Sequence, residues 1–385
     1  MIQKKPAQKR YYFDWAASAI PDMAMAPNTT VPFGNPSSMH VEGRAARDVL
    51  ENARVRCAAV LGVPPETLYF TSGGTESNCI PLFSFLARLS TGRILASRGE
   101  HSSVTENVKN LERLGKPVGY IPIDPAGRVT PSLLEKALKK YSDTRYAAIM
   151  AVNNETGTVN DMEALKNVLR KKGGPPIHLH CDMVQAAGKI PLDIAGWDVD
   201  SGSFSAHKIG GPRGIGLMYL RRPLEALYAG GGQEKNIRPG TENVVGAAAL
   251  AACLEKHADP ENLRDSYAQA RQRMKTLLAA LKNIDRCRII PEREYDDESF
   301  SPYIVQAAFR DIPGEVMARA LDDLGFAVST GSACSSSAPE RTVLAAMGIA
   351  DSISLEGIRI SMGWSTTEEE INLLLEAIRE VLKFL

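Results

Sequence analysis

The chain has 385 residues, with 45 basic and 45 acidic side chains and a formal net charge of +0. This balance argues against a nucleic-acid or membrane-surface protein, since both classes usually carry a basic excess or a basic patch. The composition is that of an ordinary globular protein, and because no apolar run reaches the length of a signal-peptide core or a membrane span, we expect a cytoplasmic location.

Helical and strand-like patterns alternate through the first two thirds of the chain. Residues 41–62 have helical periodicity and end at Gly62; a strand at 67–74 then runs into glycines, before a helix at 75–89 that Pro81 is expected to kink or shorten. Further strands are predicted at 145–152, 177–182, 201–206 and 214–220. Strands that alternate with helices predict βαβ units and a mostly parallel sheet covered on both faces.

A polar stretch at 256–267, which contains Pro260, marks a predicted domain boundary. Beyond it, helices with strands between them predict a smaller α+β domain; the helices are expected at 262–283, 314–324 and 368–384. In α/β sheets, ligands bind at the carboxyl ends of the strands. Functional residues should therefore come directly after strands.

The stretch FTSGGTESN at 70–78 is a strand end followed by glycines and the start of a helix. The free N–H groups and the dipole at a helix N-terminus suit a phosphate. The Lys-Ser/Thr pair of a P-loop and the G-x-G-x-x-G dinucleotide pattern are both absent. Taken alone, the stretch is explained at least as well by a turn and a helix cap.

The stretch IHLHCDMVQAAGK at 177–189 places Asp182 at the end of a strand, with Gln185 three residues later. A carboxylate there can keep the ring nitrogen of an electron-sink cofactor protonated. Strand alternation puts His178, His180 and Asp182 on one face, so a zinc site that also uses Cys181 is an alternative. An ordinary core strand fits the apolar neighbours equally well.

The stretch SFSAHKIGGPRG at 203–214 carries Lys208 after a strand and before several glycines. A lysine that forms a Schiff base must be partly neutral, which requires burial or a nearby cation. Ser205 and His207 offer phosphate contacts, and the glycines allow a close approach of the backbone. This position favours a functional lysine over a solvated surface charge.

The last third of the chain contains two further candidates. Cys334 lies in the Ser/Gly/Ala-rich segment 325–340, so we expect an accessible thiol and a candidate nucleophile. The other five cysteines show no C-x-x-C spacing and are predicted to be small buried side chains. Arg359, on the strand-like run 358–363, can clamp a carboxylate bidentately, although a structural ion pair is an equal alternative.

Taken together, these stretches resemble one family. The chain resembles the cysteine desulfurases of the NifS/IscS type, within the class V, fold-type I pyridoxal-phosphate (PLP) enzymes. The further matching segments are GNPSSMH (34–40), EHSSV (100–104), NNETGT (153–158), GGGQEKNIRPGTEN (230–243), STGSACSS (329–336) and IRISMG (358–363). The segments follow the family's order over nearly the whole chain, which makes the set far more specific than any one motif. The chain departs from many members at Trp15 and Ser18, where those have Asn and Thr.

The resemblance implies an α/β fold of the fold-type I PLP-dependent transferase class, with a mostly parallel seven-stranded sheet. A large PLP-binding domain would span 15–261. A small α+β domain, formed by 1–14 and 262–385, would carry the loop with the catalytic cysteine. The resemblance implies no metal site.

The resemblance also implies roles for individual residues. Lys208 would bind PLP covalently, Asp182 would pair with its ring nitrogen, and Gln185 would bond its phenolic oxygen. His101 would stack on the ring and assist proton transfer. The implied phosphate ligands are Gly74, Thr75, Ser205, His207 and, from the neighbouring subunit of a homodimer, Thr241. The implied substrate ligands are Asn35, Asn154 (which also borders the cofactor) and Arg359, which would take the carboxylate.

The implied reaction converts L-cysteine to L-alanine. The thiolate of Cys334 attacks the substrate sulfur, and the resulting persulfide passes to an acceptor, usually an iron–sulfur scaffold protein. Three alternatives stay open at this point: a selenocysteine lyase or another class V PLP enzyme, a binding protein that has kept the fold without catalysis, and a zinc protein that uses His178, His180 and Cys181. No nucleic-acid or membrane partner is expected.

Overall fold

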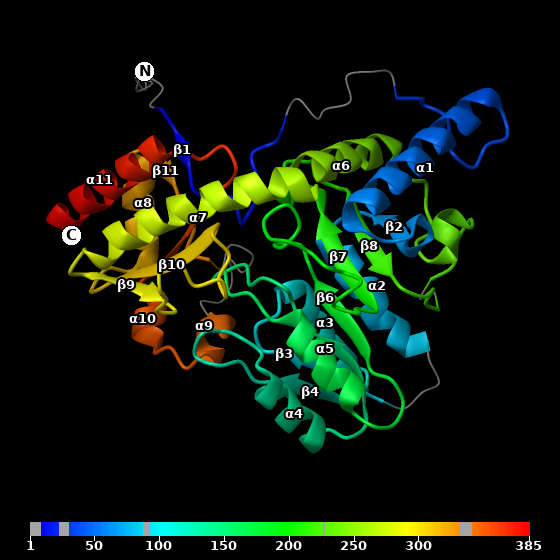
Figure 1. Ribbon diagram of the computed structural model, residues 1–385, viewed down its shortest axis with the longest axis horizontal. Helices are drawn as coiled ribbons and strands as arrows, with labels where there is room; N and C mark the ends of the chain where they lie inside the picture. The colour runs from blue at the N-terminus through cyan, green and yellow to red at the C-terminus, as the bar shows by residue number, and fades with distance from the viewer. Residues whose placement is uncertain (1–8, 23–30, 88–91, 226–227, 332–340) are drawn as a thin grey trace.

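The computed structural model describes residues 9–22, 31–87, 92–225, 228–331 and 341–385 (Figure 1). Its centre is a seven-stranded sheet in the order β2-β8-β7-β6-β5-β3-β4. The strands are β2 (Leu68–Thr71), β3 (Arg93–Ser97), β4 (Val118–Ile121), β5 (Thr144–Ala148), β6 (His178–Asp182), β7 (Ser201–Ser205) and β8 (Gly216–Leu220). Neighbouring strands from β4 to β7 pair in parallel, whereas β8 runs antiparallel to both β7 and β2. The predicted mostly parallel sheet is confirmed.

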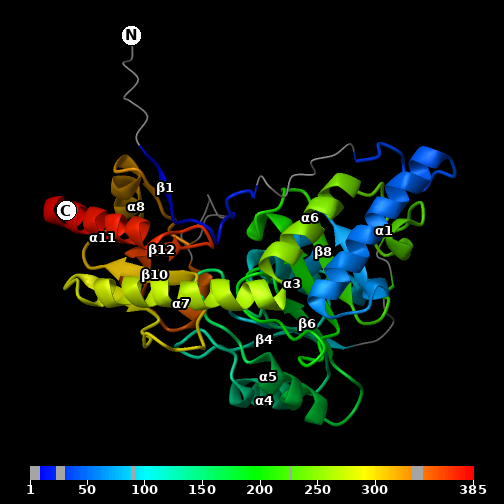
Figure 2. The same cartoon turned by 45° about the horizontal axis from the view of Figure 1, so that its top comes forward.

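Helices cover both faces of this sheet (Figures 1 and 2). They are α1 (Val41–Leu61), α2 (Gly74–Ala87), α3 (Ser102–Arg113), α4 (Pro131–Lys140), α5 (Met162–Lys171) and α6 (Val244–His257). Alternate residues of β5 belong to different cores: Ala147 packs in the core that includes α1 and α6, whereas Tyr146 and Ala148 pack in the core that includes α2 and α3. The period-two burial of a doubly covered sheet is therefore present.

A second, smaller sheet has the antiparallel order β12-β10-β9. Its strands are β9 (Cys287–Ile290), β10 (Ile304–Phe309) and β12 (Gly357–Ser361), and it packs with α7 (Pro260–Lys282), α8 (Gly314–Asp323) and α11 (Glu368–Phe384) around a core of its own. Phe13 joins that core, next to β1 (Tyr11–Tyr12), which pairs with β11 (Phe326–Ala327). Two short helices, α9 (Thr342–Ala346) and α10 (Asp351–Leu355), precede β12. A domain boundary near residue 261 stays a prediction.

The expected helix at 75–89 is present as α2, which continues to Ala87 with Pro81 inside it, so the proline does not end the helix; a kink at Pro81 stays a prediction. One strand expectation is wrong. The strand expected at 145–152 ends at Ala148, although the backbone beyond it still pairs with β6: the N–H groups of Ile149 and Ala151 donate to the carbonyls of His180 and Asp182. Within the described residues, no helix combines the length and the apolar character needed to cross a membrane.

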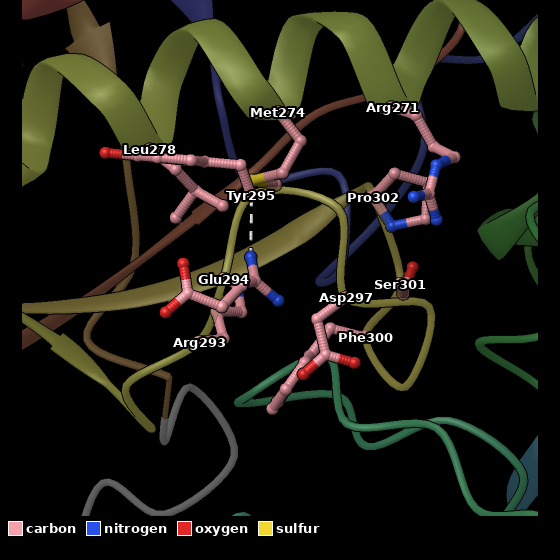
Figure 3. Close-up of a pocket in the computed structure, with 10 residues that line it drawn as sticks. All are labelled: Arg271, Met274, Leu278, Arg293, Glu294, Tyr295, Asp297, Phe300, Ser301 and Pro302. Atoms are coloured by element: carbon pink, nitrogen blue, oxygen red, sulfur yellow. Dashed lines mark hydrogen bonds between the residues drawn. The ribbon is translucent and has the colours of Figure 1, made fainter.

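A small hollow lies between α7 and the segment 293–302 (Figure 3). Its main polar group is the buried guanidinium of Arg293, which donates to the sulfur of Met274 at 3.2 Å and to the carbonyl of Ile304 at 3.0 Å. Burial lowers the pKa of Arg293 to about 10. None of the predicted site residues within the described ranges lines this hollow.

A buried ion pair ties α1 to the segment that precedes Thr241. The Nη1 and Nη2 atoms of Arg54, on α1, donate to the carboxylate of Glu234 at 2.8 and 2.7 Å. The side chains of Arg54 and Glu234 are only 5% and 1% exposed. Glu234 also accepts a hydrogen bond from the backbone of Phe70 at 2.8 Å. The pair holds the short 3₁₀ turn Gln233–Asn236, in which Glu234 and two neighbours have positive φ.

We predict that Glu234→Ala lowers the free energy of unfolding by about 2–4 kcal/mol, because it removes the buried partner of the Arg54 charge and leaves only Glu51, whose side chain is 54% exposed. Urea denaturation of the purified protein measures the change. The matched control is Glu106→Ala, which breaks an exposed pair with Lys109 and should cost less than about 1 kcal/mol. Equal losses in the two variants would contradict the role of the buried pair.

Candidate active site

The carboxyl ends of the central strands bring the predicted site residues to one edge of the sheet. Asp182 is the last residue of β6, and Lys208 ends a 3₁₀ turn that directly follows β7. His101 caps the N-terminus of α3 shortly after β3 ends. Because these strands are parallel, their carboxyl ends lie at the same edge, as the sequence analysis predicted.

Lys208 and Gln185 meet at the same backbone carbonyl. The Nζ of Lys208 donates to the carbonyls of Ala16 at 2.6 Å and Ala17 at 2.9 Å. The Nε2 of Gln185 donates to the Ala16 carbonyl at 2.8 Å. The N-terminal segment therefore holds the lysine and the glutamine side by side.

A second lysine, Lys189, is hydrogen-bonded to Gln185. Its buried Nζ donates to the Oε1 of Gln185 at 2.6 Å, which fixes the orientation of the amide. Burial, and to a smaller degree the nearby charges of Lys208 and Arg359, lowers the pKa of Lys189 to about 7. Lys208 thus lies close to other cations, the environment that the sequence analysis required of a Schiff-base lysine.

The carboxylate of Asp182 is buried and held through both oxygens. Its Oδ2 accepts a hydrogen bond from the Nδ2 of Asn78 at 2.8 Å, and its Oδ1 accepts one from the backbone of Val184 at 2.9 Å. These two bonds fix the plane of the carboxylate. An acid so fixed is suited to hold a proton on the nitrogen of a cofactor ring.

His101 is neutral, with a defined tautomer. Its Nδ1 accepts a hydrogen bond from the backbone N–H of Ser103 at 3.1 Å, so the proton of the neutral ring lies on Nε2. Burial lowers the pKa of His101, Asp182 opposes this effect, and Lys208 adds to it. Both residues thus lie close enough to His101 to influence its protonation.

Next to His101, Glu100 is a buried carboxyl that the sequence analysis did not single out. It is 3% exposed, and its Oε1 accepts hydrogen bonds from the hydroxyl of Ser97 at 2.6 Å and the backbone of Met150 at 2.8 Å. Among the described residues, its buried Oε2 has no hydrogen-bond partner. Burial, and to a smaller degree the charge of Asp182, raises the pKa of Glu100 to about 8.

The start of α2 packs closely against Val184 and Ser205; we call the backbone of Gly73 and Gly74 together with Ser205 the cradle. A Cβ atom on Gly74 would lie 2.8 Å from Cγ2 of Val184, and one on Gly73, whose φ is +151°, would lie 3.8 Å from the hydroxyl of Ser205. The first N–H groups of a helix have no acceptor within the helix, so they can donate to an anion that is bound beside Ser205. Thr75, in the same first turn, is exposed to solvent.

His207 lies directly before Lys208, and its Nδ1 is 3.3 Å from the hydroxyl of Ser18. Burial and then the positive charges of Lys208 and Arg213 lower the pKa of His207 to about 4, so it is a neutral hydrogen-bonding group at neutral pH. The other departure from the family, Trp15, packs edge-on against Trp364 with ring centroids 4.7 Å apart. Neither departure removes a predicted site residue.

Arg359 forms the structural ion pair that was one of the two roles considered for it. Its Nη2 pairs with Asp14 at 2.8 Å, and its Nη1 donates to the carbonyl of Asn154 at 2.8 Å. The side chain is buried, and its Nε has no hydrogen-bond partner among the described residues. These two bonds use two of the five N–H groups of the guanidinium, and the role of Arg359 as a carboxylate ligand stays a prediction. Arg359 contacts Asn154 through the backbone carbonyl of Asn154.

Two predicted site residues lie away from this cluster, and a third is outside the described residues. Asn35 lies in the turn before α1, where its Oδ1 accepts a hydrogen bond from the backbone of Ser37 at 2.9 Å. Thr241 is exposed, shortly before α6. Cys334 lies outside the described residues.

The histidines proposed for the zinc alternative have other partners. The Nε2 of His178 and the Nδ1 of His180 each lie 2.7 Å from the hydroxyl of Ser201, and Cys181 packs in the core on the opposite face of β6. In the part of the chain that the structure describes, no three His, Cys, Asp or Glu side chains form a group that could hold a metal ion. The geometry gives the zinc alternative no support.

The cluster fits PLP. That cofactor needs a lysine for its aldehyde, an acid for its ring nitrogen and an anion site for its phosphate. Lys208, Asp182 and the cradle at Gly74 and Ser205 supply these groups at one edge of the sheet.

Comparison with known proteins identifies the family. The model of the aminotransferase class-V family matches residues 11–374. The chain belongs to the aminotransferase class-V family. Among its relatives, a NifS/IcsS protein homolog of Lactobacillus delbrueckii subsp. bulgaricus is 38% identical over 96% of each chain. A cysteine desulfurase IscS of Dictyoglomus turgidum is 35% identical and covers 98% of this chain and 95% of its own.

A solved NifS-like protein has the same architecture as this class-V member. It superposes with a TM-score of 0.89 at 35% identity and covers 98% of this chain and all of its own. The expected fold-type I transferase class and the expected resemblance to NifS/IscS proteins are confirmed.

Sequence reasoning missed four residues of the class-V site: Asp14, Asn78, Glu100 and Lys189. The last three stand within motifs that were recognised, one to four residues from a predicted site residue. A signal was available, because a polar residue at a predicted buried position needs a partner. Asp14 gave no comparable signal, since its partner Arg359 lies 345 residues away.

We predict that Glu100→Gln makes the apo-protein more stable than the parent at pH 8.5, with the difference disappearing near pH 5. The folded-state pKa of Glu100 is about 8, against an ordinary value of 4.5. Between these values only the folded state binds the proton, so the stability that Glu100 contributes is lost as pH rises through 8. The amide keeps the shape of the protonated acid and does not titrate. Melting temperatures across this range test the prediction, with Glu106→Gln on the exposed face of α3 as the control. A difference between Glu100→Gln and the parent that is the same at both pH values would refute it.

We predict that Gly74→Ala weakens PLP binding about tenfold, because its Cβ would overlap Val184 and displace the cradle. Equilibrium dialysis of the apo-protein against PLP measures the dissociation constant. Gly173→Ala is the control, since a Cβ there would meet nothing within 4 Å. Equal affinity in the two variants would exclude this role of the cradle.

Proposed function

We propose that this class-V protein is a PLP-dependent cysteine desulfurase that converts L-cysteine to L-alanine and transfers the sulfur through Cys334. The observation that carries the proposal is the position of Lys208 at the carboxyl end of β7, with the fixed carboxylate of Asp182 and the neutral imidazole of His101 as electrostatic neighbours. Relatives that carry the name cysteine desulfurase IscS, at 35% identity or more over nearly the full length, support the same activity.

Different residues of this site hold different groups of the cofactor. Lys208 binds the aldehyde, Asp182 the ring nitrogen and Gln185 the phenolic oxygen, while Ser205, His207 and the N-terminus of α2 hold the phosphate. Once bound, PLP withdraws electrons from the substrate, so that the α-proton can leave and the carbon–sulfur bond can break. The neighbouring Lys189 keeps the amide of Gln185 in one orientation.

The chain's own groups orient the substrate and move its protons. Arg359 binds the carboxylate through its remaining donors, and Asn154 lies against the same guanidinium. His101 exchanges protons through Nε2, since Nδ1 is committed to Ser103. Because its ring is neutral at working pH, His101 does not compete with Arg359 for the carboxylate.

The thiol of Cys334 accepts the sulfur atom of the substrate. The thiolate of Cys334 forms a bond with the substrate sulfur as the Cβ–S bond breaks; cysteine and thiol become alanine and persulfide with no external oxidant. The five cysteines in the described part of the chain are poorly suited to this step, since burial raises the pKa of each thiol, to about 11 at Cys79 and about 12 at Cys57, Cys253 and Cys287 and well above its ordinary value at Cys181.

We also propose a homodimer in which Thr241 and Asn35 reach the site of the neighbouring subunit. Both residues are exposed: Asn35 precedes α1 and Thr241 precedes α6, two helices that pack against each other (Figure 2). Large apolar side chains in the segment around Asn35 are exposed too, with Phe33 at 91% and Met39 at 88%. Such exposure is typical of a surface that is covered in an assembly. A sulfur-accepting iron–sulfur scaffold protein and a cytoplasmic location stay predictions.

The function is tested by incubating the holoenzyme with L-cysteine and measuring alanine and sulfide. We predict that Lys208→Ala abolishes both products and the visible absorption of the lysine-bound cofactor, because the covalent link is lost. We predict that Cys334→Ala keeps the absorption band and still binds L-cysteine, yet releases little sulfide.

The control for the thiol is Cys287→Ala, which should release sulfide at the parent rate because that thiol is half-buried and protonated. Parent-like sulfide release from Cys334→Ala would reject the persulfide step. L-selenocysteine tested beside L-cysteine separates the selenocysteine lyase alternative: a clear preference for the selenium compound would replace the proposed substrate.

A further inference from the structure

Asn78, in the second turn of α2, is at the centre of the polar groups behind the site. It is 1% exposed, and all of its side-chain hydrogen-bonding capacity is used. Its Nδ2 donates to Asp182 at 2.8 Å and to the hydroxyl of Ser103 at 2.8 Å. Its Oδ1 accepts from the Nε2 of His180 at 2.9 Å and from the hydroxyl of Ser203.

The direction of each bond follows from chemistry. The carboxylate of Asp182 can only accept, so the amide nitrogen of Asn78 must face it and the amide oxygen must face His180. His180 therefore carries its proton on Nε2. Burial lowers the pKa of His180 to about 3, so the ring is neutral and its Nδ1 accepts from the hydroxyl of Ser201 at 2.7 Å.

A chain of hydrogen bonds thus runs along β6 toward Asp182. The hydroxyl of Ser201 donates to His180 and in turn accepts from the Nε2 of His178 at 2.7 Å. Every donor in this chain points the same way, ending at the Asn78 amide. Bonds aligned in one direction polarise and strengthen one another.

A second branch leads from the same amide to His101. The hydroxyl of Ser103 accepts from Asn78 and therefore has its proton free to donate to the Nδ1 of His101 at 2.9 Å. One amide group thus connects the carboxylate of Asp182 with the imidazole of His101. The proposed function assigns Asp182 to the ring nitrogen of the cofactor and His101 to the exchange of substrate protons. These two groups come from β6 and from the cap of α3, which are otherwise separate in the sequence.

We propose that Asn78 is a positioning residue that orients, at one amide, both the carboxylate of Asp182 and, through the Ser103 hydroxyl, the imidazole of His101. The Nε2–H tautomer of His101 is already set by the backbone N–H of Ser103, and the Ser103 hydroxyl adds a second donor to the same Nδ1. The inference rests on the proposed function, since it concerns how the chain prepares those two residues for PLP. Asn78 itself touches neither the substrate nor the cofactor. Its role is to present a fixed carboxylate to the ring nitrogen and a fixed imidazole to the substrate.

The decisive variant is Asn78→Asp, which is isosteric. It keeps an acceptor for His180 and Ser203 but replaces the donor that faces Asp182 with a second acidic oxygen. Two facing carboxyl groups must share a proton, so Asp182 can no longer present a full charge. The ring nitrogen of the bound cofactor should then lose its proton.

The primary readout is nitrogen-15 NMR of the holoenzyme loaded with ring-labelled PLP, because the chemical shift reports protonation of that nitrogen directly. We expect a protonated nitrogen in the parent and loss of most of that signal in Asn78→Asp at pH 8. A second readout is the exchange of the α-hydrogen of L-alanine with deuterated solvent, which does not need Cys334. We expect this exchange to fall about 10- to 100-fold, as for a lost hydrogen bond to a charged group.

The matched control is Ser84→Ala, which removes a buried hydrogen bond on the same helix but has no link to Asp182. It should match the parent in both readouts. Ser103→Ala separates the two branches: the ring nitrogen should stay protonated while α-hydrogen exchange falls at least about tenfold. Asn78→Ala, which adds no charge, covers the case in which Asn78→Asp does not fold, and should shift both readouts in the same direction.

The outcomes are distinguishable. If the parent binds no PLP, or exchanges no α-hydrogen, the proposed function itself fails. If the parent behaves as expected but the Asn78 variants keep a protonated ring nitrogen, the link to Asp182 is wrong. If Ser103→Ala exchanges the α-hydrogen at the parent rate, the link to His101 is wrong.

Discussion

The pairing of β6 with β7 is the constraint on which the site depends. The register sets His180 opposite Ser201 and Asp182 opposite Ser203. Because side chains alternate along a strand, a slip of one residue would turn Asp182 to the opposite face of the sheet and remove both histidines from Ser201. A Cβ at Gly202 of β7 would lie 2.0 Å from the terminal methyl of Met183, so a larger residue there would require the Met183 side chain to move. Lys208 follows β7 within a few residues, which means that one strand pair sets the positions of both the acid and the amine.

The sequence was sufficient to find the residues whose position depends on strand periodicity. Asp182 and Lys208 follow apolar runs of strand length, and the parallel sheet then brings their ends together. The shared face of His178, His180 and Asp182 was also predicted correctly from alternation. What sequence could not supply is which partners these side chains choose. A histidine pair next to an acid looks the same in a zinc site as in a hydrogen-bonded chain until Ser201 and Asn78 are placed beside it. Those contacts cross 21 to 102 residues and depend on how α2 packs on the sheet.

The protein has no net charge, yet its site is built from buried ionisable groups. Glu100 is held largely protonated and Lys189 partly neutral, since burial penalises the charged form of each. Arg359 keeps its charge by pairing with Asp14. Perturbed groups of this kind gather where chemistry is carried out, and their shared cost in stability must be offset by the apolar cores on either side.

The N-terminal segment joins parts of the chain that are far apart in sequence. The carbonyl of Ala16 receives both Lys208 and Gln185, Asp14 pairs with Arg359, and the backbone of Phe13 accepts a hydrogen bond from Ser361. During synthesis on the ribosome, Asp14 emerges early, but its arginine partner is made only after more than nine tenths of the chain. The pocket therefore stays incomplete until the strand that carries Arg359 has been made and has folded against the N-terminal segment.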